Sequence, residues 1–458
     1  MSSGLLWMII YGILMIVATL FFTRRSKGED FHVGNRDMGA VSSAMSIAAT
    51  WIWAPALFTS SQQAYTNGIA GLFWFVVPNV LCLLVFIPFA KRIRIEMPEG
   101  ITLSGYMGEK YKSKGVQRTY LFQLTALTFL STTVQLLAGG KIMSVLTGVP
   151  FIWMVVALAG ITFAYSQFSG IKASVLTDVL QMLLMLAACA IFVPWALKGD
   201  GIGNLIAGLG GIDGSHRSIL DPGVFFAFGL STAIGLISGP FGDQCFWQRA
   251  FSIKKDRIGR AFGLGALFFA IVPVSMGILG FIAAGSGFSA KDTGIVNLEL
   301  VTSLFPKWAT IPFMLMLISG LMSTLDSNLC AIASLTTDIT HDHNNLKIPI
   351  LSMAVLLLAS IGFANVPGLT VTGMFMVYGT LRSSTLLPTV FTLKGVKLKA
   401  KGVMIGVIAA LCLGLPVFIY GTVNGLSLYK TIGCLMTVLI SGILALLLSK
   451  GGAEVARA

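Results

Sequence analysis

Residues 45–61 read MSIAATWIWAPALFTSS, and a proline in the middle of this apolar stretch decides how the segment folds. Proline lacks a backbone donor and clashes with the preceding helical turn. Pro55 should therefore interrupt a helix and free the carbonyl of Trp51, and unwinding nearby would also expose the carbonyls of Ala49 and Ile52. The alternative is a simple kink, because proline is also common in ordinary membrane helices.

The apolar character of this stretch extends over the whole chain of 458 residues, of which 55% are hydrophobic and 11% are charged. A soluble domain carries about 25% charged residues, so lipid is the solvent that fits this composition. Because a membrane helix needs roughly 20 mostly apolar residues, we predict an all-α polytopic membrane protein with about 13 transmembrane helices. We place them at residues 4–22, 40–66, 69–90, 119–145, 150–168, 171–197, 222–240, 262–285, 307–338, 347–364, 368–392, 402–421 and 427–448.

The net charge of +13 could suggest a nucleic-acid partner, but the basic residues lie in short loops between apolar runs. Alternate loops hold most of them, which is typical of the cytoplasmic side of a membrane. The pattern predicts a multi-pass protein of the inner or plasma (cell) membrane, with the N-terminus outside and the C-terminus cytoplasmic. Membrane lipid is the implied environment, and neither nucleic acid nor an obligate protein partner is expected.

Four charged residues fall inside predicted spans, where each costs about 2.5–3.5 kcal/mol on insertion scales and is therefore a functional candidate. They are Lys141, Asp178, Asp326 and Arg382. Lys141 lies near a helix end and can extend its amine to the membrane surface. Asp326 and Arg382 could form an ion pair, either structural or involved in transport.

Two further segments carry unusual residues for a membrane helix. Residues 223–242 contain Ser-Gly-Pro at 238–240 and several glycines, so a second interruption is expected there. Half-helix ends near the middle of the membrane form ion and solute sites in transporters. Residues 320–327 read GLMSTLDS; their small side chains are usually explained by helix packing, but Ser323 and Thr324 could also supply oxygen ligands to a hard cation.

No residue pattern in the chain indicates an enzyme. The phosphate-binding sequence GxxxxGK[ST] is missing, and no catalytic residues or cofactor are expected. His341 and His343 flank Asp342 in a predicted inner loop, where metal binding is an alternative to a solvated loop.

Five stretches, in this order along the chain, resemble the sodium:solute symporter family (solute carrier family 5-like), which includes proline, pantothenate, sialic acid and galactose transporters. They are residues 30–38 (DFHVGNRDM), 169–181 (SGIKASVLTDVLQ), 243–250 (DQCFWQRA), 322–329 (MSTLDSNL) and 334–338 (SLTTD). Residues 51–74, 136–140, 146–148 and 243–250 look most similar to the urea-transporting branch of the family.

The resemblance implies a LeuT-like fold, a five-plus-five inverted repeat with one helix before it and two after. The corresponding division is 1–38 (first extra helix and inner loop), 39–197 (first repeat), 198–395 (second repeat) and 396–458 (two C-terminal helices and a short tail). It also implies sodium-coupled symport of a small polar organic solute by alternating access, with urea or a similar neutral solute as the first choice.

The same resemblance implies a sodium site between the broken first core helix and the eighth. Its ligands would be the backbone carbonyls of Ala49, Ile52 and Gly320 and the hydroxyls of Ser323 and Thr324. Asp178 matches a family aspartate associated with the sodium path. Sodium is thus the expected coupling ion.

For a small neutral solute, a pocket needs acceptors for amide hydrogens and donors for a carbonyl. The nearest candidates, each of which could equally serve packing or the membrane interface, are Trp51, Trp53, Ser60, Ser61, Gln62 and Gln135. Three alternatives remain open: a proton-coupled symporter that uses Asp178 or Asp326, a symporter of an amino acid or monocarboxylate, and a passive facilitator.

Overall fold

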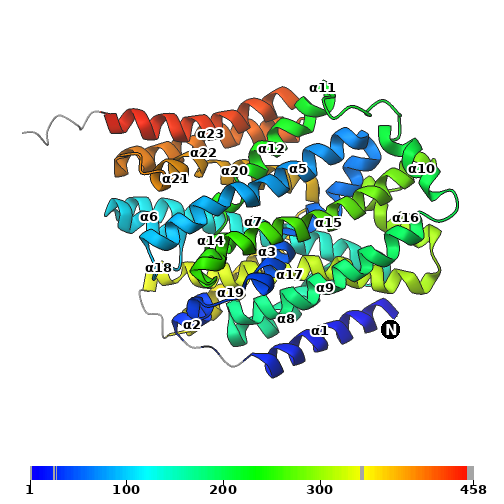
Figure 1. The fold of residues 1–458 in the computed structure, drawn as a ribbon, viewed down its shortest axis with the longest axis horizontal. Helices are drawn as coiled ribbons and strands as arrows, with labels where there is room; N and C mark the ends of the chain where they lie inside the picture. Colours follow the sequence, from blue (N-terminus) through cyan, green and yellow to red (C-terminus); the bar gives the residue numbers. More distant parts are fainter. Residues whose placement is uncertain (1–2, 24–25, 27, 341–344, 451–458) are drawn as a thin grey trace, which may run out of the picture.

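The computed structural model describes residues 3–23, 26, 28–340 and 345–450; His341, Asp342 and His343 therefore lie outside the described residues. Its regular elements are helices, and ten of the described helices are long and apolar enough to cross a membrane. Most run side by side across the molecule (Figure 1). They are α1 (Ser3–Phe22), α5 (Thr59–Glu96), α7 (Lys114–Thr147), α8 (Phe151–Ser169), α9 (Ile171–Ala196), α15 (Ile258–Gly285), α17 (Thr310–Leu335), α19 (Lys347–Ala364), α22 (Ala400–Val423) and α23 (Ser427–Lys450).

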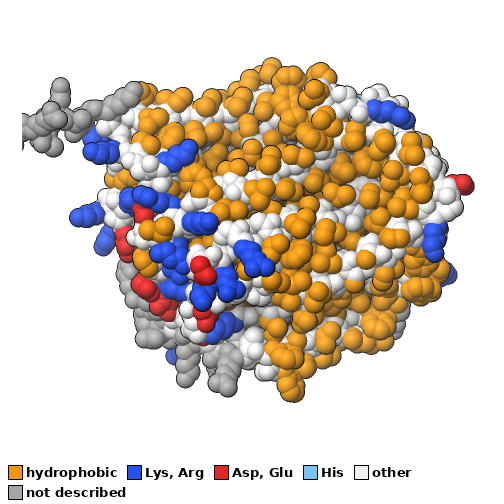
Figure 2. Space-filling view, viewed as in Figure 1, with side chains coloured by type: hydrophobic (Ala, Val, Ile, Leu, Met, Phe, Trp, Pro, Cys, Tyr) orange, Lys and Arg blue, Asp and Glu red, His pale blue; other side chains and the backbone are white. Residues whose placement is uncertain are grey.

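The outer surface of the helices is apolar, as contact with lipid requires. Large apolar side chains on it are freely exposed, among them Phe21 at 83% and Leu358 at 70%. Figure 2 shows apolar side chains over most of one face, whereas lysines and arginines gather at the left end, where α2 (Glu29–Val33), α6 (Leu103–Tyr111) and α18 (Thr337–Thr340) lie in Figure 1. An apolar belt with charge confined to the ends is the surface of a multi-pass membrane protein.

The predicted interruption at Pro55 is confirmed. Helix α3 (Ala40–Trp51) ends where Ile52 and Trp53 leave the helical conformation, and the short α4 (Ala54–Leu57) then begins. Pro55 stands in the first turn of α4, a position where no backbone donor is needed. The chain next enters α5, in which Gly68 has a φ of 56°. This break separates residues 59–66 from the rest of α5, close to the predicted boundary between the second and third spans.

A second interruption lies where the Ser-Gly-Pro sequence predicted it. The short α11 (Pro222–Val224) leads into a π-helical turn over Phe225–Gly229 and then into α12 (Leu230–Ile237). Helix α13 (Gly239–Gly242) follows, and Asp243 is extended before α14 (Gln244–Ser252) begins. The predicted span at 368–392 is divided as well, into α20 (Val371–Ser383) and α21 (Leu386–Leu393). The predicted thirteen transmembrane segments are reached only if three interrupted segments, α3–α4, α11–α14 and α20–α21, are counted together with the ten long helices.

Helix α17 occupies the centre of the molecule. Every residue from Met316 to Leu335 is buried, and the helix contacts α3, α7, α8, α9, α14 and α19. It runs unbroken, although the length of the predicted span 307–338 left room for a break. Polar side chains on α17 must therefore find their partners within the protein, because no water reaches them.

Candidate ion and solute sites

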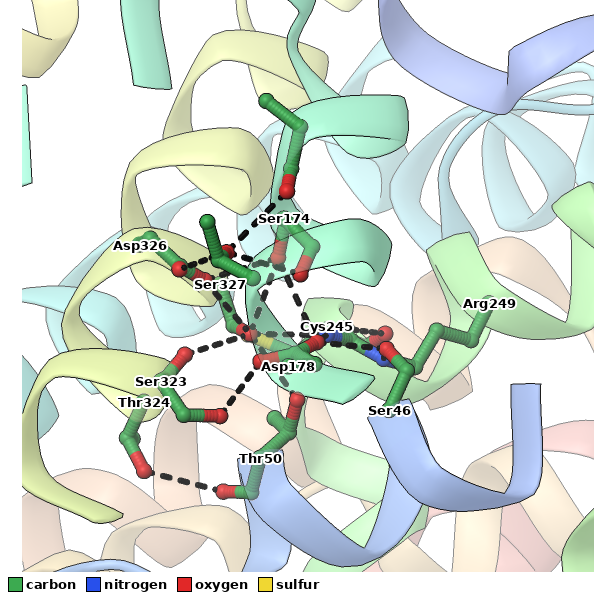
Figure 3. Close-up of polar contacts among 12 residues, drawn as sticks. Ser46, Thr50, Ser174, Asp178, Cys245, Arg249, Ser323, Thr324, Asp326 and Ser327 are labelled. Atoms are coloured by element: carbon green, nitrogen blue, oxygen red, sulfur yellow. Dashed lines mark hydrogen bonds and ion pairs between the residues drawn. The ribbon is translucent and has the colours of Figure 1, made fainter. Parts of the chain in front are cut away.

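A buried ion pair joins α9 to α14 (Figure 3). Nη2 of Arg249 lies 2.9 Å from Oδ2 of Asp178, and both side chains are at most 1% exposed. The Ser46 hydroxyl donates to the same carboxylate oxygen at 2.5 Å, and Ser323 donates to the other oxygen. Arg249 also donates from Nε to Ser46 and from Nη2 to Ser327, at 3.0 and 2.7 Å. The pair thus ties α3, α9, α14 and α17 together.

A second carboxylate, Asp326, lies next to this pair, and no lysine or arginine in the described part of the chain forms an ion pair with it. It accepts hydrogen bonds from the hydroxyls of Ser174, Thr177 and Tyr165 at 2.7, 2.9 and 3.0 Å. Ser174 also lies 3.5 Å from Asp178, which links the two acids. The connected group therefore holds two buried carboxylates and one guanidinium.

The sequence does not single out Arg249, because it stands just before Lys254, Lys255, Arg257 and Arg260 and reads as one more basic residue of a predicted cytoplasmic loop. One signal could have separated it from them. The lysines and arginines that follow it stand together at 254–260, whereas Arg249 is alone within an aromatic run that includes Phe246 and Trp247. The short helix α14 turns Arg249 inward, where it is 1% exposed.

The possible Asp326–Arg382 ion pair is wrong. Asp326 is held by hydroxyl groups, while Arg382 donates from Nε to the carbonyl of Gly235 at 2.6 Å and its two terminal nitrogens have no hydrogen-bond partner. The guanidinium lies over the rings of Trp51 and Tyr378, with its carbon 5.2 and 4.7 Å from their centroids. Tertiary contacts therefore place Arg382 at the break of the second interrupted segment rather than beside α17.

The residues predicted as sodium ligands come from two elements that touch, α3 and α17. A Cβ atom on Gly320 would lie 3.0 Å from the Ile52 carbonyl oxygen, so the glycine allows the two backbones to approach. The Thr324 hydroxyl donates to the carbonyls of Thr50 and Gly320, at 3.0 and 3.3 Å. The Ala49 carbonyl accepts from the Ile52 amide at 3.2 Å.

The residues predicted to bind solute do not form a single pocket. Trp51, Trp53 and Gln135 lie at the break, where Gln135 Oε1 accepts from the amide of Ala54 at 2.9 Å. Ser60 and Ser61 donate to carbonyls of their own chain segment, those of Ala56 and Phe58. Gln62 is farther along, where it donates to Thr293 and accepts from Thr372, both at 3.1 Å.

Gln62 lines a cavity of about 260 Å³ between the start of α5, α7 and α20, which we call the vestibule. Phe58, Thr59, Thr372, Lys141 and Asp292 also line it. Lys141 and Asp292 form an ion pair across its wall, so the amine of Lys141 has a protein partner rather than only the membrane surface. Partial burial is the largest single influence on the pKa of the Asp292 carboxyl and raises it. The hydrogen bond from Lys141, the one from the Gly294 amide and the charge of Lys141 together outweigh burial and hold that pKa below its ordinary value.

Comparison with known proteins bears on these sites. The sequence model of the sodium:solute symporter family matches residues 31–410. A urea-proton symporter of rice (Oryza sativa subsp. japonica) is 24% identical over 90% of this chain and 65% of its own length. A urea active transporter of Saccharomyces cerevisiae is 25% identical over 83% of this chain and 57% of its own length. The chain thus spans less than two thirds of these urea-transporting relatives.

Other similar proteins have different solutes in their names. A high-affinity proline transporter of Bacillus subtilis is 24% identical over 70% of each chain. Among solved structures, a substrate-bound, outward-open sodium-coupled sialic acid symporter superposes with a TM-score of 0.78 at 16% identity, over 97% of both chains. MhsT in complex with L-phenylalanine superposes with a TM-score of 0.59 at 15% identity, over 90% of this chain and 98% of its own. These likenesses show that the chain has the LeuT-like transporter fold.

Proposed function

Since the chain belongs to the sodium:solute symporter family, whose members are secondary active transporters and not enzymes, we propose that it couples sodium entry to uptake of a small polar solute. One observation carries the proposal. The interrupted end of α3 faces the small and hydroxyl side chains of α17, and Gly320 leaves room for the Ile52 carbonyl. Carbonyl and hydroxyl oxygens are the ligands that a hard monovalent cation prefers.

In the proposed site, sodium binds the carbonyls of Ala49, Ile52 and Gly320 and the hydroxyls of Ser323 and Thr324. The hydroxyl of Thr324 already lies within 3.3 Å of two carbonyl oxygens, and Ser323 extends toward Asp178. A hydroxyl can donate to one neighbour while its oxygen ligates an ion. Asp178 lies on the sodium path in this proposal, because it accepts the hydrogen bond of Ser323 and so orients the oxygen of that hydroxyl for the ion.

Transport proceeds in this proposal by alternating access. The repeats at 39–197 and 198–395 rock against each other, solute and sodium enter from the side of the N-terminus, and both leave at the basic, cytoplasmic end. One sodium ion moving down about 100 mV provides roughly 2.3 kcal/mol, and a tenfold gradient adds about 1.4 kcal/mol. Together these support accumulation of several hundredfold at one-to-one coupling, enough for uptake of a scarce solute.

Urea or a similar neutral solute is the first choice for the cargo. The urea-transporting relatives support it, and so does the lack of charge between residues 40 and 64. The proline-transporting relative makes an amino acid or monocarboxylate the alternative. Uptake of radiolabelled urea, proline, pantothenate, acetate and sialic acid into proteoliposomes, with and without a sodium gradient, separates these choices. Uptake indifferent to sodium in every case would identify a facilitator instead.

The sodium ligands are tested by a double variant, Ser323→Ala with Thr324→Ala. It removes two oxygen ligands while leaving the backbone in place, so we expect the half-saturating sodium concentration to rise at least tenfold. The matched control is Thr336→Ala with Thr337→Ala, two adjacent hydroxyls that donate to carbonyls of their own turn at 2.7 Å. Unchanged sodium dependence in the Ser323/Thr324 variant would refute these ligands.

Proton coupling is a second candidate, and the uncompensated carboxylate of Asp326 favours it. The buried group holds two acids and one guanidinium, so it would carry one negative charge in excess if both acids were ionised. A buried charge without a partner is costly, so binding of a proton or of a second cation would relieve it. The rice relative, a urea-proton symporter, points the same way.

Asp326→Asn distinguishes the two couplings, because the amide keeps the shape but cannot exchange a proton. If a proton is the coupling ion, uptake driven by an acid-outside pH gradient without sodium should be present in the unmodified protein and absent in the variant. If sodium alone is coupled, neither protein accumulates solute in sodium-free buffer. Asp256→Asn, at an exposed carboxylate on the basic end, serves as the control.

A further inference from the structure

Arg382 is the unusual charged residue of the described core, because its polar atoms are buried and largely unused. The side chain is 0% exposed, and of its nitrogens only Nε makes a hydrogen bond, to the carbonyl of Gly235. Nη1 and Nη2, which together carry four N–H donors, have no partner. Buried donors without partners are rare in folded proteins and call for an explanation such as a ligand.

The surroundings hold the guanidinium in place without using these donors. Its central carbon lies over the rings of Trp51 and Tyr378, an arrangement in which the rings attract the cation. A Cβ at Gly239 would lie 2.4 Å from the Trp51 ring and 3.3 Å from Nη1, so only glycine fits at that point of α13. Arg382 is therefore packed in a defined position, with the edge that bears Nη1 close to the second helix break.

The nearby carboxylate of Asp243 is already engaged. It accepts from the Tyr378 hydroxyl at 2.6 Å and from the amide of Cys245 at 2.9 Å, and it forms no ion pair with Arg382. The donors of Arg382 therefore stay open. An acceptor that could bind them has to come from outside the protein.

One face of α20 connects Arg382 with the vestibule. Thr372, Phe375, Tyr378 and Arg382 recur at intervals of three and four residues, so they lie on the same side of the helix. Thr372 lines the vestibule, while Phe375 and Tyr378 pack against Trp53 with ring centroids 5.4 and 5.0 Å away. An aromatic layer thus separates the vestibule from the guanidinium.

Other polar atoms around the layer are also buried and unpaired. Nε1 of Trp53 is a free donor, Oδ1 of Asn79 is a free acceptor, and the hydroxyl of Thr232 is free to donate or to accept. Asn79 neighbours Trp51, because Nε1 of Trp51 donates to the backbone carbonyl of Asn79 at 3.2 Å. The cavity that Arg382 and Thr232 line measures only about 10 Å³, so a solute can enter only when the helices around it move apart.

We propose that Arg382 binds the solute, with Nη1 and Nη2 donating to a carbonyl or carboxylate oxygen. Trp51 and Trp53 cover the solute, and Phe375 and Tyr378 close behind it when the vestibule is sealed. The solute must therefore carry an oxygen acceptor, and a cation without one is excluded. This inference rests on the proposed symport, since it names the group that recognises the cargo.

Two probes that share this chemistry test the proposal on the unmodified protein. Urea presents a neutral carbonyl and L-proline a carboxylate, whereas guanidinium and pyrrolidine keep the respective shapes without the oxygen. We expect purified protein to bind at least one of the two oxygen-bearing probes in sodium, followed by tryptophan fluorescence or by radioligand. The probe of the same shape that lacks the oxygen, guanidinium for urea or pyrrolidine for L-proline, should bind at least tenfold more weakly. Equal competition by guanidinium or pyrrolidine, or no binding of either oxygen-bearing probe, overturns the proposal.

Variants then assign the effect to Arg382. A hydrogen bond to a charged group contributes about 1.5–3 kcal/mol, so Arg382→Gln should weaken probe binding about ten- to a hundredfold. Arg382→Lys should recover part of the loss, because it keeps the charge but not the two-nitrogen geometry. Arg94→Gln is the matched control, at a buried arginine near the end of α5. Probe binding within twofold of normal in Arg382→Gln would contradict the assignment.

Sodium dependence separates this proposal from the symport on which it rests. In Arg382→Gln the half-saturating sodium concentration should change less than twofold, since the sodium ligands come from α3 and α17. If solute binding depends on Arg382 but uptake ignores the sodium gradient, the symport fails and the solute site stands. If uptake depends on the sodium gradient but is unchanged by the loss of Arg382, the symport stands and the solute site at Arg382 fails.

Discussion

Two arginines, Arg249 and Arg382, are both almost completely buried, but they differ in how many of their nitrogens are hydrogen-bonded and to which groups. Arg249 uses all three of its nitrogens, on Asp178, two serines and a carbonyl. Arg382 uses one nitrogen and rests on two aromatic rings. The first arginine joins four helices, and the second keeps its donors open beside two helix breaks.

The difference teaches what each charge is for. A guanidinium whose three nitrogens are all hydrogen-bonded is part of the frame that holds the helices together, because its removal strands an acid in a place without water. A guanidinium whose donors are open contributes little to the frame and can give its full hydrogen-bonding capacity to a ligand. Replacing Arg249 should therefore mainly lower the stability of the protein, whereas replacing Arg382 should mainly lower its affinity for the solute.

The largest effect is expected from Arg249→Gln. It leaves the Asp178 carboxylate buried without a counter-charge, which costs about 3–5 kcal/mol. Thermal unfolding in detergent should show a lower midpoint, and uptake should be lost. Adding Asp178→Asn should restore part of the stability, because the pair is then removed together. An Arg249→Gln protein as stable as the original would show that the ion pair does not hold the helices.

A smaller effect is expected from Gly239→Ala at the break beside Arg382. The new methyl group would meet the Trp51 ring, and overpacking of this kind costs about 1–3 kcal/mol. We expect solute affinity to fall more than sodium affinity, because Trp51 and Arg382 are the groups displaced. Gly160→Ala is the control, since a Cβ there meets nothing within 4 Å. Equal behaviour of the two variants in binding assays would argue against close packing at this break.

Arg382→Gln should change the free energy of unfolding by less than about 1 kcal/mol. It removes a hydrogen bond and the contact with two rings, but it also removes two buried nitrogens without partners, so the effects oppose each other. Its thermal midpoint should lie far closer to that of the original protein than the midpoint of Arg249→Gln. Similar destabilisation by both variants would erase the distinction drawn between them.

The smallest effect is expected at the mouth of the vestibule. Lys141 and Asp292 are 48% and 37% exposed, and pairs of this kind contribute less than about 1 kcal/mol. Lys141→Gln should change the rate of solute uptake less than twofold, and added potassium chloride should reduce even that difference by screening. A loss of transport in this variant would mean that Lys141 acts on the solute directly.

Much of the fold could be predicted from the sequence because hydropathy is a local property. The end of α1 at Phe22, the two ends of α19 and the break at Pro55 all follow from runs of apolar residues and from a missing backbone donor. The division of the span at 368–392 into α20 and α21 was not predicted, since Ser384 and Thr385, which separate the two helices, carry no strong break signal.

The candidate sites were predictable only in part. Ser323, Thr324 and Asp178 stand out in the sequence, but the partner of Asp178 does not, because Arg249 lies 71 residues farther along the chain. Arg382 also stands out, yet its expected partner was wrong. Which two side chains meet depends on how helices pack, and no local pattern encodes it.

The sequence by itself determined that this protein spans a membrane, that its helices break at Pro55 and near Pro240, and that charges stand inside its spans. Composition and backbone chemistry are enough for each of these conclusions. Only the tertiary structure decided that Arg249 pairs with Asp178. It also decided that, among the described residues, Asp326 has no cationic partner and Arg382 keeps open donors beside Trp51. Burial makes an unpaired charge costly, so the arrangement of partners, rather than the presence of charges, distinguishes frame from binding site.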